Sequence, residues 1–283
     1  GLGYITYHAH LPPFKEMADA GEVVFQAFCD TDADTANERA REFGANAVYT
    51  DHHEMFDKEE LDGVYLCIPP TLHTDVETVA AEKGIAIFIE KPQTLDISQA
   101  VAFNKAIAAG GVLSQVGFMS RYYPSSEFVK EKVGAGTPRH ALVQLLYSGR
   151  HIRHWTSRVE LCGGSFVENT IHMVDLLRFF LGDIESVSAF YHERKPGEGP
   201  EPINLPHVYD VNYRFKSGVV ASATTSRVLT NVKCSRQDVS VILDDALLEW
   251  SSQDVTENDE KVFSAPEENN AFARQAQAFV AAI

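Results

Sequence analysis

The sequence predicts two domains of different fold class, an α/β domain over residues 1–118 and an α+β domain over residues 119–283. In the first part, short runs of hydrophobic residues alternate with stretches of helical periodicity, which is typical of parallel strands buried on both faces. After Phe118, hydrophobic and polar residues alternate along several predicted strands. This pattern indicates an open, mainly antiparallel sheet with one packed face.

Four strands and three helices are expected in the first domain. The clearest strands are Val23–Phe28, Gly63–Ile68, Ile85–Ile89 and Val112–Phe118. Helical spacing predicts helices at Ala33–Phe43, Leu72–Lys83 and Ile97–Ala109. Strands that alternate with helices pair in parallel, so a doubly wound sheet is expected. Such a sheet has a strand before its first loop, whereas this sequence opens on Gly1, so we expect the natural chain to begin one strand earlier.

The second domain is expected to contain helices at Ser125–Val133 and near Glu168–Leu181. Its expected strands are Arg139–Tyr147, Ser186–Tyr191, Val208–Phe215, Val219–Arg227, Val239–Leu243 and Leu247–Trp250. The segment His192–Pro206 is rich in Pro, Gly and charged residues and predicts a loop or flap. A final helix at Ala271–Ile283 runs to the last residue, so we expect the natural chain to continue beyond it.

The formal net charge of −16 argues against binding to nucleic acid or to anionic membrane surfaces, because both carry negative charge. The richest basic stretch, Arg150–Arg158, is interleaved with His151, His154 and Trp155. This mixture suits the wall of a pocket better than a track for phosphates.

The four cysteines, Cys29, Cys67, Cys162 and Cys234, have no regular spacing, which favours a reducing compartment. No apolar run is long enough to span a bilayer, so we expect a cytoplasmic protein without membrane contact. An export signal removed from the start of the natural chain remains an alternative.

The opening residues Gly1-Leu2-Gly3-Tyr4-Ile5-Thr6 are similar to the glycine-rich loop of a Rossmann domain, in which backbone N–H groups approach a pyrophosphate. Asp30 follows a predicted buried strand at the distance where an acid binds the adenosine ribose of NAD. No arginine lies close after Asp30, and Arg39 is too far along the helix to hold a 2′-phosphate, so NADP is the less favoured cofactor. Thr6 departs from the small third residue of the loop, and the alternative is a turn with an aspartate helix cap.

Two further motifs follow predicted strands. Pro69-Pro70-Thr71-Leu72-His73 ends one strand and opens a helix, and Glu90-Lys91-Pro92 ends the next strand. Ligands of open α/β sheets bind at the carboxyl ends of the strands, so His73 and Lys91 are expected near such a crevice. For His73 the alternative is a surface histidine at a helix end.

A third motif, Gly163-Gly164 followed by Glu168, His172 and Asp175, lies on a predicted helix. At spacings of four and three residues both acids flank the imidazole on one helix face, while Ile171, Val174, Leu177 and Phe180 form the packed stripe. A histidine braced by a carboxylate suits general acid–base catalysis. The alternative is an ordinary helix start with a half-buried histidine.

These motifs, in this order, resemble the Gfo/Idh/MocA family of oxidoreductases, which includes glucose-fructose oxidoreductase and inositol dehydrogenase. The likeness covers nearly the whole chain and includes Val116-Gly117-Phe118-Met119-x-Arg121 besides the motifs above. The resemblance implies that Lys91 binds the reacting hydroxyl, that His172 is the acid–base group, and that Glu168 stands where many members have aspartate. With Thr170 in place of a usual small residue, this implies a substrate other than the best-known ones.

The expected site can now be stated in full. The residues expected to contact NAD are Gly1, Gly3, Tyr4, Ile5, Asp30, Pro69, His73, Glu90 and Lys91. Those expected to be catalytic are Lys91, His172 and Glu168, and those expected to bind substrate are Arg121, Trp155 and Asp175. Tyr122 and Tyr123 could equally pack in a core. No metal is expected, because His8-x-His10 and His151-x-x-His154 have no identifiable third ligand.

The hypothesis from the sequence is an NAD-dependent dehydrogenase that oxidises a secondary hydroxyl of a sugar, polyol, cyclitol or related small molecule. His172 would take the hydroxyl proton while Lys91 stabilises the developing alkoxide. The alternatives are a redox-neutral enzyme with tightly bound NAD and a non-catalytic sensor or repressor that binds a dinucleotide. The open sheet face also predicts a homodimer or homotetramer.

Overall fold

The computed structural model describes residues 1–147, 155–198, 201–229, 232 and 234–283. The chain forms two compact units, one made of Gly1–Gly117 with Phe272–Ile283 and the other of Phe118–Ala271. The sequence had predicted the last helix as part of the second domain, but it packs with the first unit, where Phe279 is buried against Ala86 and Phe88. Hydrophobic spacing shows that a helix has a buried face, and it does not show which core receives that face.

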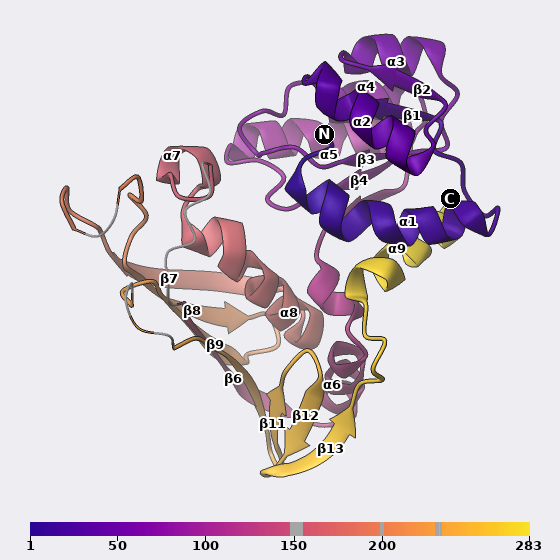
Figure 1. Cartoon of the computed structure of the whole chain (residues 1–283). Helices are drawn as coiled ribbons and strands as arrows, with labels where there is room; N and C mark the ends of the chain where they lie inside the picture. The colour runs from indigo at the N-terminus through magenta and orange to yellow at the C-terminus, as the bar shows by residue number, and fades with distance from the viewer. Residues whose placement is uncertain (148–154, 199–200, 230–231, 233) are drawn as a thin grey trace. The chain divides into compact units, whose positions relative to one another are not determined.

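The first unit consists of parallel strands and helices, as the sequence predicts (Figure 1). Its strands are β1 (Ala27–Cys29), β2 (Ala47–Tyr49), β3 (Gly63–Leu66), β4 (Ala86–Ile89) and β5 (Ser114–Val116). Its helices are α1 (Leu11–Asp19), α2 (Ala33–Phe43), α3 (His52–Lys58), α4 (Val76–Glu82), α5 (Ile97–Gly110) and α9 (Ala271–Ala282). A π-helical turn, η1 (Thr6–His10), leads into α1. Strand β1 pairs in parallel with β2, and β3, β4 and β5 form a second parallel sheet.

The predicted elements of this unit differ from the observed ones mainly at their ends. Helix α4 begins at Val76 rather than at Leu72, because the N–H of Leu72 donates to the carbonyl of Pro69 and closes a turn. The elements α1, β2 and α3 were not predicted from the sequence. Strand β2 has only three residues, all half-buried, so it lacks the hydrophobic run that marked its neighbours.

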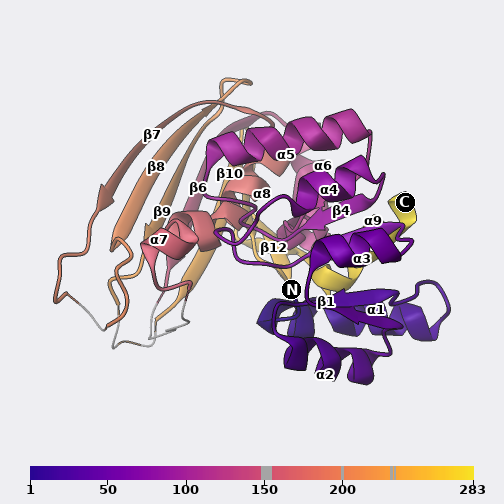
Figure 2. The same ribbon diagram turned by 90° about the horizontal axis from the view of Figure 1, so that it is seen from above.

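The second unit is an eight-stranded sheet with helices on one face (Figures 1 and 2). Its strand order is β13-β12-β11-β10-β6-β9-β8-β7, in which only the β6–β9 pair is parallel. The strands are β6 (Pro138–Leu146), β7 (Ile184–His192), β8 (Val208–Phe215), β9 (Val220–Ser226), β10 (Arg236–Leu243), β11 (Leu247–Trp250), β12 (Asp254–Glu257) and β13 (Glu260–Ser264). Its helical elements are η2 (Met119–Tyr122), α6 (Pro124–Ala135), α7 (Val159–Cys162), η3 (Phe166–Thr170) and α8 (Ile171–Leu181).

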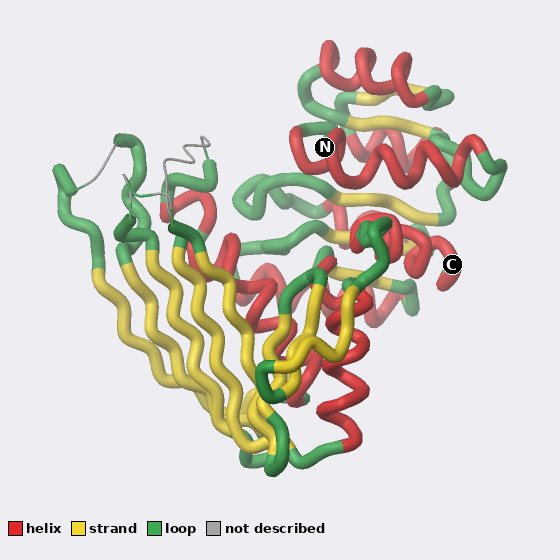
Figure 3. The backbone as a smooth tube through the Cα atoms, turned by 60° about the horizontal axis from the view of Figure 1, so that its bottom comes forward, coloured by secondary structure: helices red, strands yellow, loops and turns green. Residues whose placement is uncertain are grey.

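One face of this sheet forms the core of the unit with α6 and α8, and the other face is open. Val143, Val211, Ala223 and Val241 alternate with outward-facing residues and pack with Leu176 and other residues of α8. On the open face, Ser222 donates to Asn212 and Thr224 donates to Asp210, so much of that face is polar. The α+β fold and the alternation of the strands are therefore confirmed (Figure 3).

Strands β12 and β13 were not predicted from the sequence. They form a hairpin through Asn258 and Asp259, which both have positive φ angles, as tight hairpin turns require. Both strands are short and largely polar, which hid their periodicity. Among the described residues, no helix combines the length and the hydrophobicity that would be needed to cross a membrane.

Candidate cofactor and substrate site

The glycine loop of the first unit joins the carboxyl ends of its two sheets. The N–H of Leu2 donates to Oδ2 of Asp30 at 2.7 Å, just after β1. On the other side, a Cβ atom at Gly1 would lie 2.5 Å from the carbonyl oxygen of Cys67, just after β3. A side chain at position 1 would therefore push the loop away from β3, which explains the need for glycine.

The loop leaves its outer side open, as binding of a dinucleotide requires. A Cβ atom at Gly3 would meet nothing within 4 Å, and Tyr4 and Ile5 are exposed on the first helical turn. The helix starts here, because the N–H of Tyr7 donates to the carbonyl of Gly3. Helix starts of this kind present N–H groups to phosphate oxygens, so these residues fit the pyrophosphate of NAD.

Thr6, the residue that departs from the expected loop pattern, points into the protein. Its side chain is buried, and its hydroxyl donates to the carbonyl of Gly1 at 2.8 Å. The hydroxyl thus satisfies a backbone acceptor of the loop itself. The larger residue is compatible with the loop because it lies on the inner side, away from the open face at Gly3.

Asp30 lies where the sequence predicts the ribose-binding acid. Its Oδ1 accepts from the N–H of Asp32 at 3.0 Å while Oδ2 accepts from Leu2, so two backbone donors fix the carboxylate. An ionised carboxylate has about four acceptor positions, which leaves room for ribose hydroxyls. Arg39 is engaged elsewhere, since it pairs with Glu38 and Glu42 and stacks on Tyr7. This arrangement fits NAD better than NADP.

Glu90 and Lys91 follow β4, at the carboxyl end of the sheet. Oε2 of Glu90 accepts from the N–H of Lys91 at 2.8 Å, and Oε1 lies 2.9 Å from Nε2 of His10. Glu90 and His10 are both buried. A Cβ atom at Gly117 would lie 2.9 Å from the Glu90 carboxyl carbon, so the backbone after β5 closes over this group. Glu90 was expected to contact NAD, but its two oxygens bind within the protein, and we interpret it as a residue that positions Lys91.

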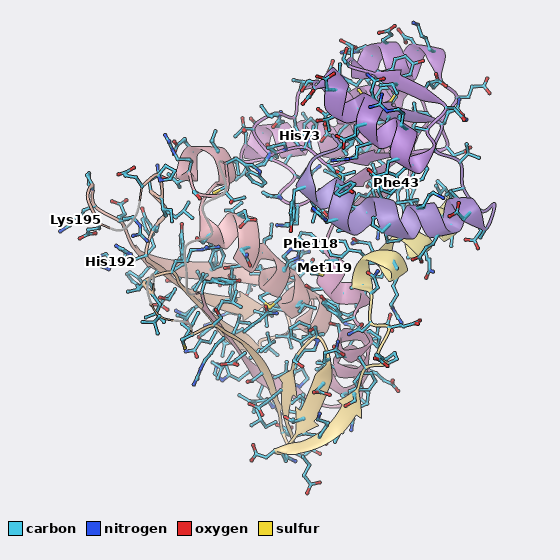
Figure 4. All side chains as sticks on the ribbon, in the orientation of Figure 1. Phe43, His73, Phe118, Met119, His192 and Lys195 are labelled. Atoms are coloured by element: carbon cyan, nitrogen blue, oxygen red, sulfur yellow. The ribbon has the colours of Figure 1, made fainter. Side chains whose placement is uncertain are left out.

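His73 is also directed inward (Figure 4). Its Nδ1 is hydrogen-bonded to Glu77, which is fully buried, and its Nε2 is 3.3 Å from the carbonyl oxygen of Ile68. Both ring nitrogens are therefore used to hold the turn after β3. The alternative of a surface histidine is therefore wrong, whereas the contact of His73 with NAD stays a prediction. Pro69 remains at the turn itself, half-buried.

In the second unit, Asp175 binds Arg121 instead of bracing His172 as predicted. Arg121 donates from Nε to Oδ2 at 2.7 Å and from Nη2 to Oδ1 at 2.6 Å. This bidentate hydrogen bond raises the pKa of the Arg121 guanidinium above its usual value. Helical spacing allows Asp175 to reach either partner, and the guanidinium provides two parallel charge-assisted hydrogen bonds, which an imidazole cannot. We interpret the pair as fixing α8 against η2, the element that begins with Met119 (Figure 4).

Glu168 and His172 lie on either side of a change in helix geometry. Glu168 belongs to the π-helical turn η3, and His172 lies in the first turn of α8 with its ring 6.4 Å from that of Phe118. The prediction of one regular helix from Glu168 was therefore wrong at its start. The packed stripe of α8 is also shifted, since Met173 and Leu176 are buried with Leu177 and Phe180.

Two contacts with the sheet of the second unit hold η3 and the glycine turn before it. Thr170 is buried, and its hydroxyl lies 2.7 Å from the hydroxyl of Thr225 on β9. Gly164 has a φ of +92°, and a Cβ atom there would lie 2.3 Å from the hydroxyl oxygen of Tyr209. The double glycine and the unusual threonine thus both have structural causes.

The remaining candidates have mixed outcomes. Trp155 is half-buried in a turn, while His151 and His154 lie outside the described residues. Tyr123 packs against the core, with its ring 6.2 Å from that of Trp250, and burial raises the pKa of its hydroxyl.

Among the described residues, one group of three side chains has the donors and the spacing for a metal ion: His52, His53 and Asp75, of which His53 and Asp75 are exposed. The sequence did not single out this group. His10 is paired with Glu90. All four cysteines are free, and burial raises the pKa of the Cys67 thiol to about 12.

The sequence predicted no role in the site for several residues that lie close to its expected members. They are His10 in the first unit and, in the second unit, Tyr147, Asn169, Tyr209 and Arg227. For Arg227 a signal was present, because it is a cation at the end of a predicted buried strand. His10 lies 80 positions from Glu90 in the sequence, so no local pattern could predict that the two side chains are paired.

Comparisons with known proteins agree with both units. Residues 1–118 match the family model "Oxidoreductase family, NAD-binding Rossmann fold", and residues 131–249 match "GFO/IDH/MocA C-terminal domain". The chain is 32% identical over 155 residues to scyllo-inositol 2-dehydrogenase (NAD(+)) of Bacillus subtilis, covering 54% of this chain and 45% of that protein. It is 27% identical over 235 residues to myo-inositol 2-dehydrogenase of Thermotoga maritima, covering 80% and 67%.

Solved structures share the fold. An oxidoreductase from Thermotoga maritima superposes with a TM-score of 0.86 at 20% identity, covering 100% of this chain and 86% of that one. Levoglucosan dehydrogenase in complex with NADH and L-sorbose gives a TM-score of 0.84 at 17% identity, covering 100% and 87%. The chain thus spans most of these structures, but only 45% to 67% of the two curated relatives above.

Proposed function

The chain belongs to the GFO/IDH/MocA family of oxidoreductases, and on this basis we propose that it is an NAD-dependent dehydrogenase acting on a sugar, polyol, cyclitol or related compound. The observation that carries the proposal is the placement of Lys91 in the first unit. Lys91 follows β4 at the carboxyl end of the parallel strands, the end at which the glycine loop and Asp30 also lie. Ligands of such sheets bind at this end.

The proposed reaction removes a proton and a hydride from one carbinol group. NAD, when bound, accepts the hydride. The residues that would hold it are the glycine loop from Gly1 to Ile5 and Asp30. His172 takes the hydroxyl proton, and the ammonium of Lys91 stabilises the negative charge that develops on the same oxygen. Glu168 lies four positions before His172 and acts on the same substrate or on the imidazole.

A spectrophotometric screen tests this function. NAD and NADP reduction would be followed with matched sets of sugars, polyols, cyclitols and their acids. Accumulation of NADH with one chemical class supports the proposal. Consumption of a substrate without net NADH would indicate redox-neutral chemistry instead, and no turnover of any compound, with NAD bound, would favour a sensor.

We also propose that the protein forms a homodimer or homotetramer through the open face of its second unit. Phe190 is 75% exposed on this face, where it pairs with the exposed Asp210 of β8. Large hydrophobic side chains exposed on a sheet face are commonly covered by a second subunit.

A further inference from the structure

Arg227, at the end of β9, is a cation without a matching anion. Its Nε atom is buried without a hydrogen-bond partner among the described residues. The guanidinium carbon lies 4.8 Å from the centre of the Tyr147 ring, so the group stacks on an aromatic platform. No carboxylate of the described part pairs with it, and the residues outside that part include no Asp or Glu.

This cation lies beside the proposed catalytic turn. The hydroxyl of Tyr147 donates to Oδ1 of Asn169 at 2.5 Å, and Asn169 follows Glu168 in η3. Burial raises the pKa of Tyr147 to about 12, and the charges of Arg227 and Glu168 both act on it. Thr225, two positions before Arg227, holds Thr170 from the same strand. The charges of Arg227 and Glu168 therefore both lie close enough to Tyr147 to act on its hydroxyl, in opposite directions.

The chain around Arg227 is basic although the protein is acidic. Leu146 and Ser226 are paired in register, and Arg236 pairs with Leu146, so the three adjacent central strands β9, β6 and β10 have one end in common. In the sequence, residues 147–159 and 226–237 contain no Asp or Glu, in a chain with 40 acidic residues and a net charge of −16. Of the described residues in these two segments, Arg158, Arg227 and Arg236 are basic, and Arg158 is paired with Glu160. A local excess of positive charge against such a background favours an anionic ligand.

We propose that Arg227 binds an anionic group of the substrate, so that the substrate is an acidic sugar or polyol bearing a carboxylate or a phosphate. This inference rests on the proposed function, and it adds the chemical class of the substrate. A carboxylate or phosphate oxygen at Nε would satisfy the buried donor, and a second oxygen can bind a terminal nitrogen in the usual bidentate manner. Repulsion by Glu168 would keep the anionic group on the Arg227 side of Tyr147 and turn a neutral hydroxyl towards Glu168 and His172.

The test compares matched neutral and acidic substrates with three variants. NADH formation would be measured with glucose, glucuronate and glucose 6-phosphate, and with the corresponding galactose set. We expect a higher kcat/KM for one acidic class, and we expect R227Q to lower it about 10- to 100-fold, as for loss of a charge-assisted hydrogen bond. R227K should recover part of the loss, because it keeps the charge without the planar fork. The carboxylate and phosphate arms identify which anion is bound.

The control is R236Q, which removes one positive charge at an exposed position, at the same end of the central strands as Arg227. If the preference reflects a specific contact, R236Q changes kcat/KM much less than R227Q does. An equal loss of kcat/KM in R227Q and R236Q overturns the inference. So does a wild type that turns over the neutral sugars better than the acidic ones, together with an R227Q variant whose kcat/KM equals that of the wild type. In both cases the dehydrogenase function stands. If no compound reduces NAD, the function fails, and calorimetric titration of wild type and R227Q with glucuronate and inorganic phosphate still decides whether Arg227 binds an anion.

Discussion

Nε2 of His10 and Oε1 of Glu90 lie 2.9 Å apart inside the first unit, between residues 80 positions apart in the chain. The His10 ring is enclosed by aromatic rings, with centroid distances of 5.5 Å to Tyr65, 5.3 Å to Phe88 and 5.3 Å to Phe272. The pair therefore links the first helix to the turn that carries Lys91.

We expect H10A to disturb both stability and catalysis. Removing one partner of a buried pair leaves the other without compensation, so the unfolding free energy should fall by about 3 kcal/mol. The double variant H10A/E90Q should recover part of this loss, because a neutral amide tolerates burial better than a carboxylate. Chemical denaturation checks the first effect. In H10A, kcat should fall while the dissociation constant of NAD changes little. If kcat and the affinity for NAD fell by the same factor, the pair would support the whole fold instead.

Lys91 and His172 should behave as one catalytic unit. We expect K91M and H172A each to lower kcat by about 10²- to 10⁴-fold, because both groups act on charge that appears in the transition state. The double variant should lose much less than the product of the single losses. Kinetics of the four proteins, with NAD affinity measured separately, decide this, and near-normal turnover in either single variant contradicts it.

Asp30 should determine the cofactor preference. D30A removes the acceptor of the Leu2 N–H and the repulsion of a 2′-phosphate, so the preference for NAD over NADP should narrow by about tenfold. Fluorescence titration with NADH and NADPH measures both affinities. D34A is the matched control, because it removes an exposed carboxylate from the same helix start. Tighter binding of NADPH by the wild type would refute the assignment.

Assembly through the open sheet face can be tested with two substitutions on strand β7. Phe190 and Val187 are both exposed on β7, but Phe190 pairs with the exposed Asp210 while Val187 pairs with the buried Tyr213, so they lie on opposite faces. Sedimentation at micromolar concentration should show a dimer or tetramer for the wild type. F190E should shift it towards monomer and V187E should not. A wild-type monomer would leave the open face to another role.

The sequence was sufficient for features that depend on local periodicity. Strand β4 reads as a continuous hydrophobic run because it is buried on both faces, and β8 alternates because one of its faces is open. Short elements such as β2 lack enough residues to show either pattern. Partners are harder to infer than elements, as Asp175 shows, because its spacing from His172 is compatible with a contact that Arg121 takes instead. The buried orientation of His73 likewise depends on Glu77 and on the carbonyl of Ile68, which only the folded chain brings to its two ring nitrogens.

The position of α9 has a consequence for how the protein reaches its folded state. Phe279 packs on Phe88 and Tyr65, and its ring also contacts the backbone position of Gly63. The core of the first unit therefore joins residues that lie about two hundred positions apart in the chain. During synthesis on the ribosome, all of the second unit emerges before this helix does. The face of β3 and β4 that receives Phe279 is therefore uncovered in the nascent chain, and contacts of such long sequence separation form slowly. Helix α9 thus completes the core of a unit whose strands are all synthesised before the second unit.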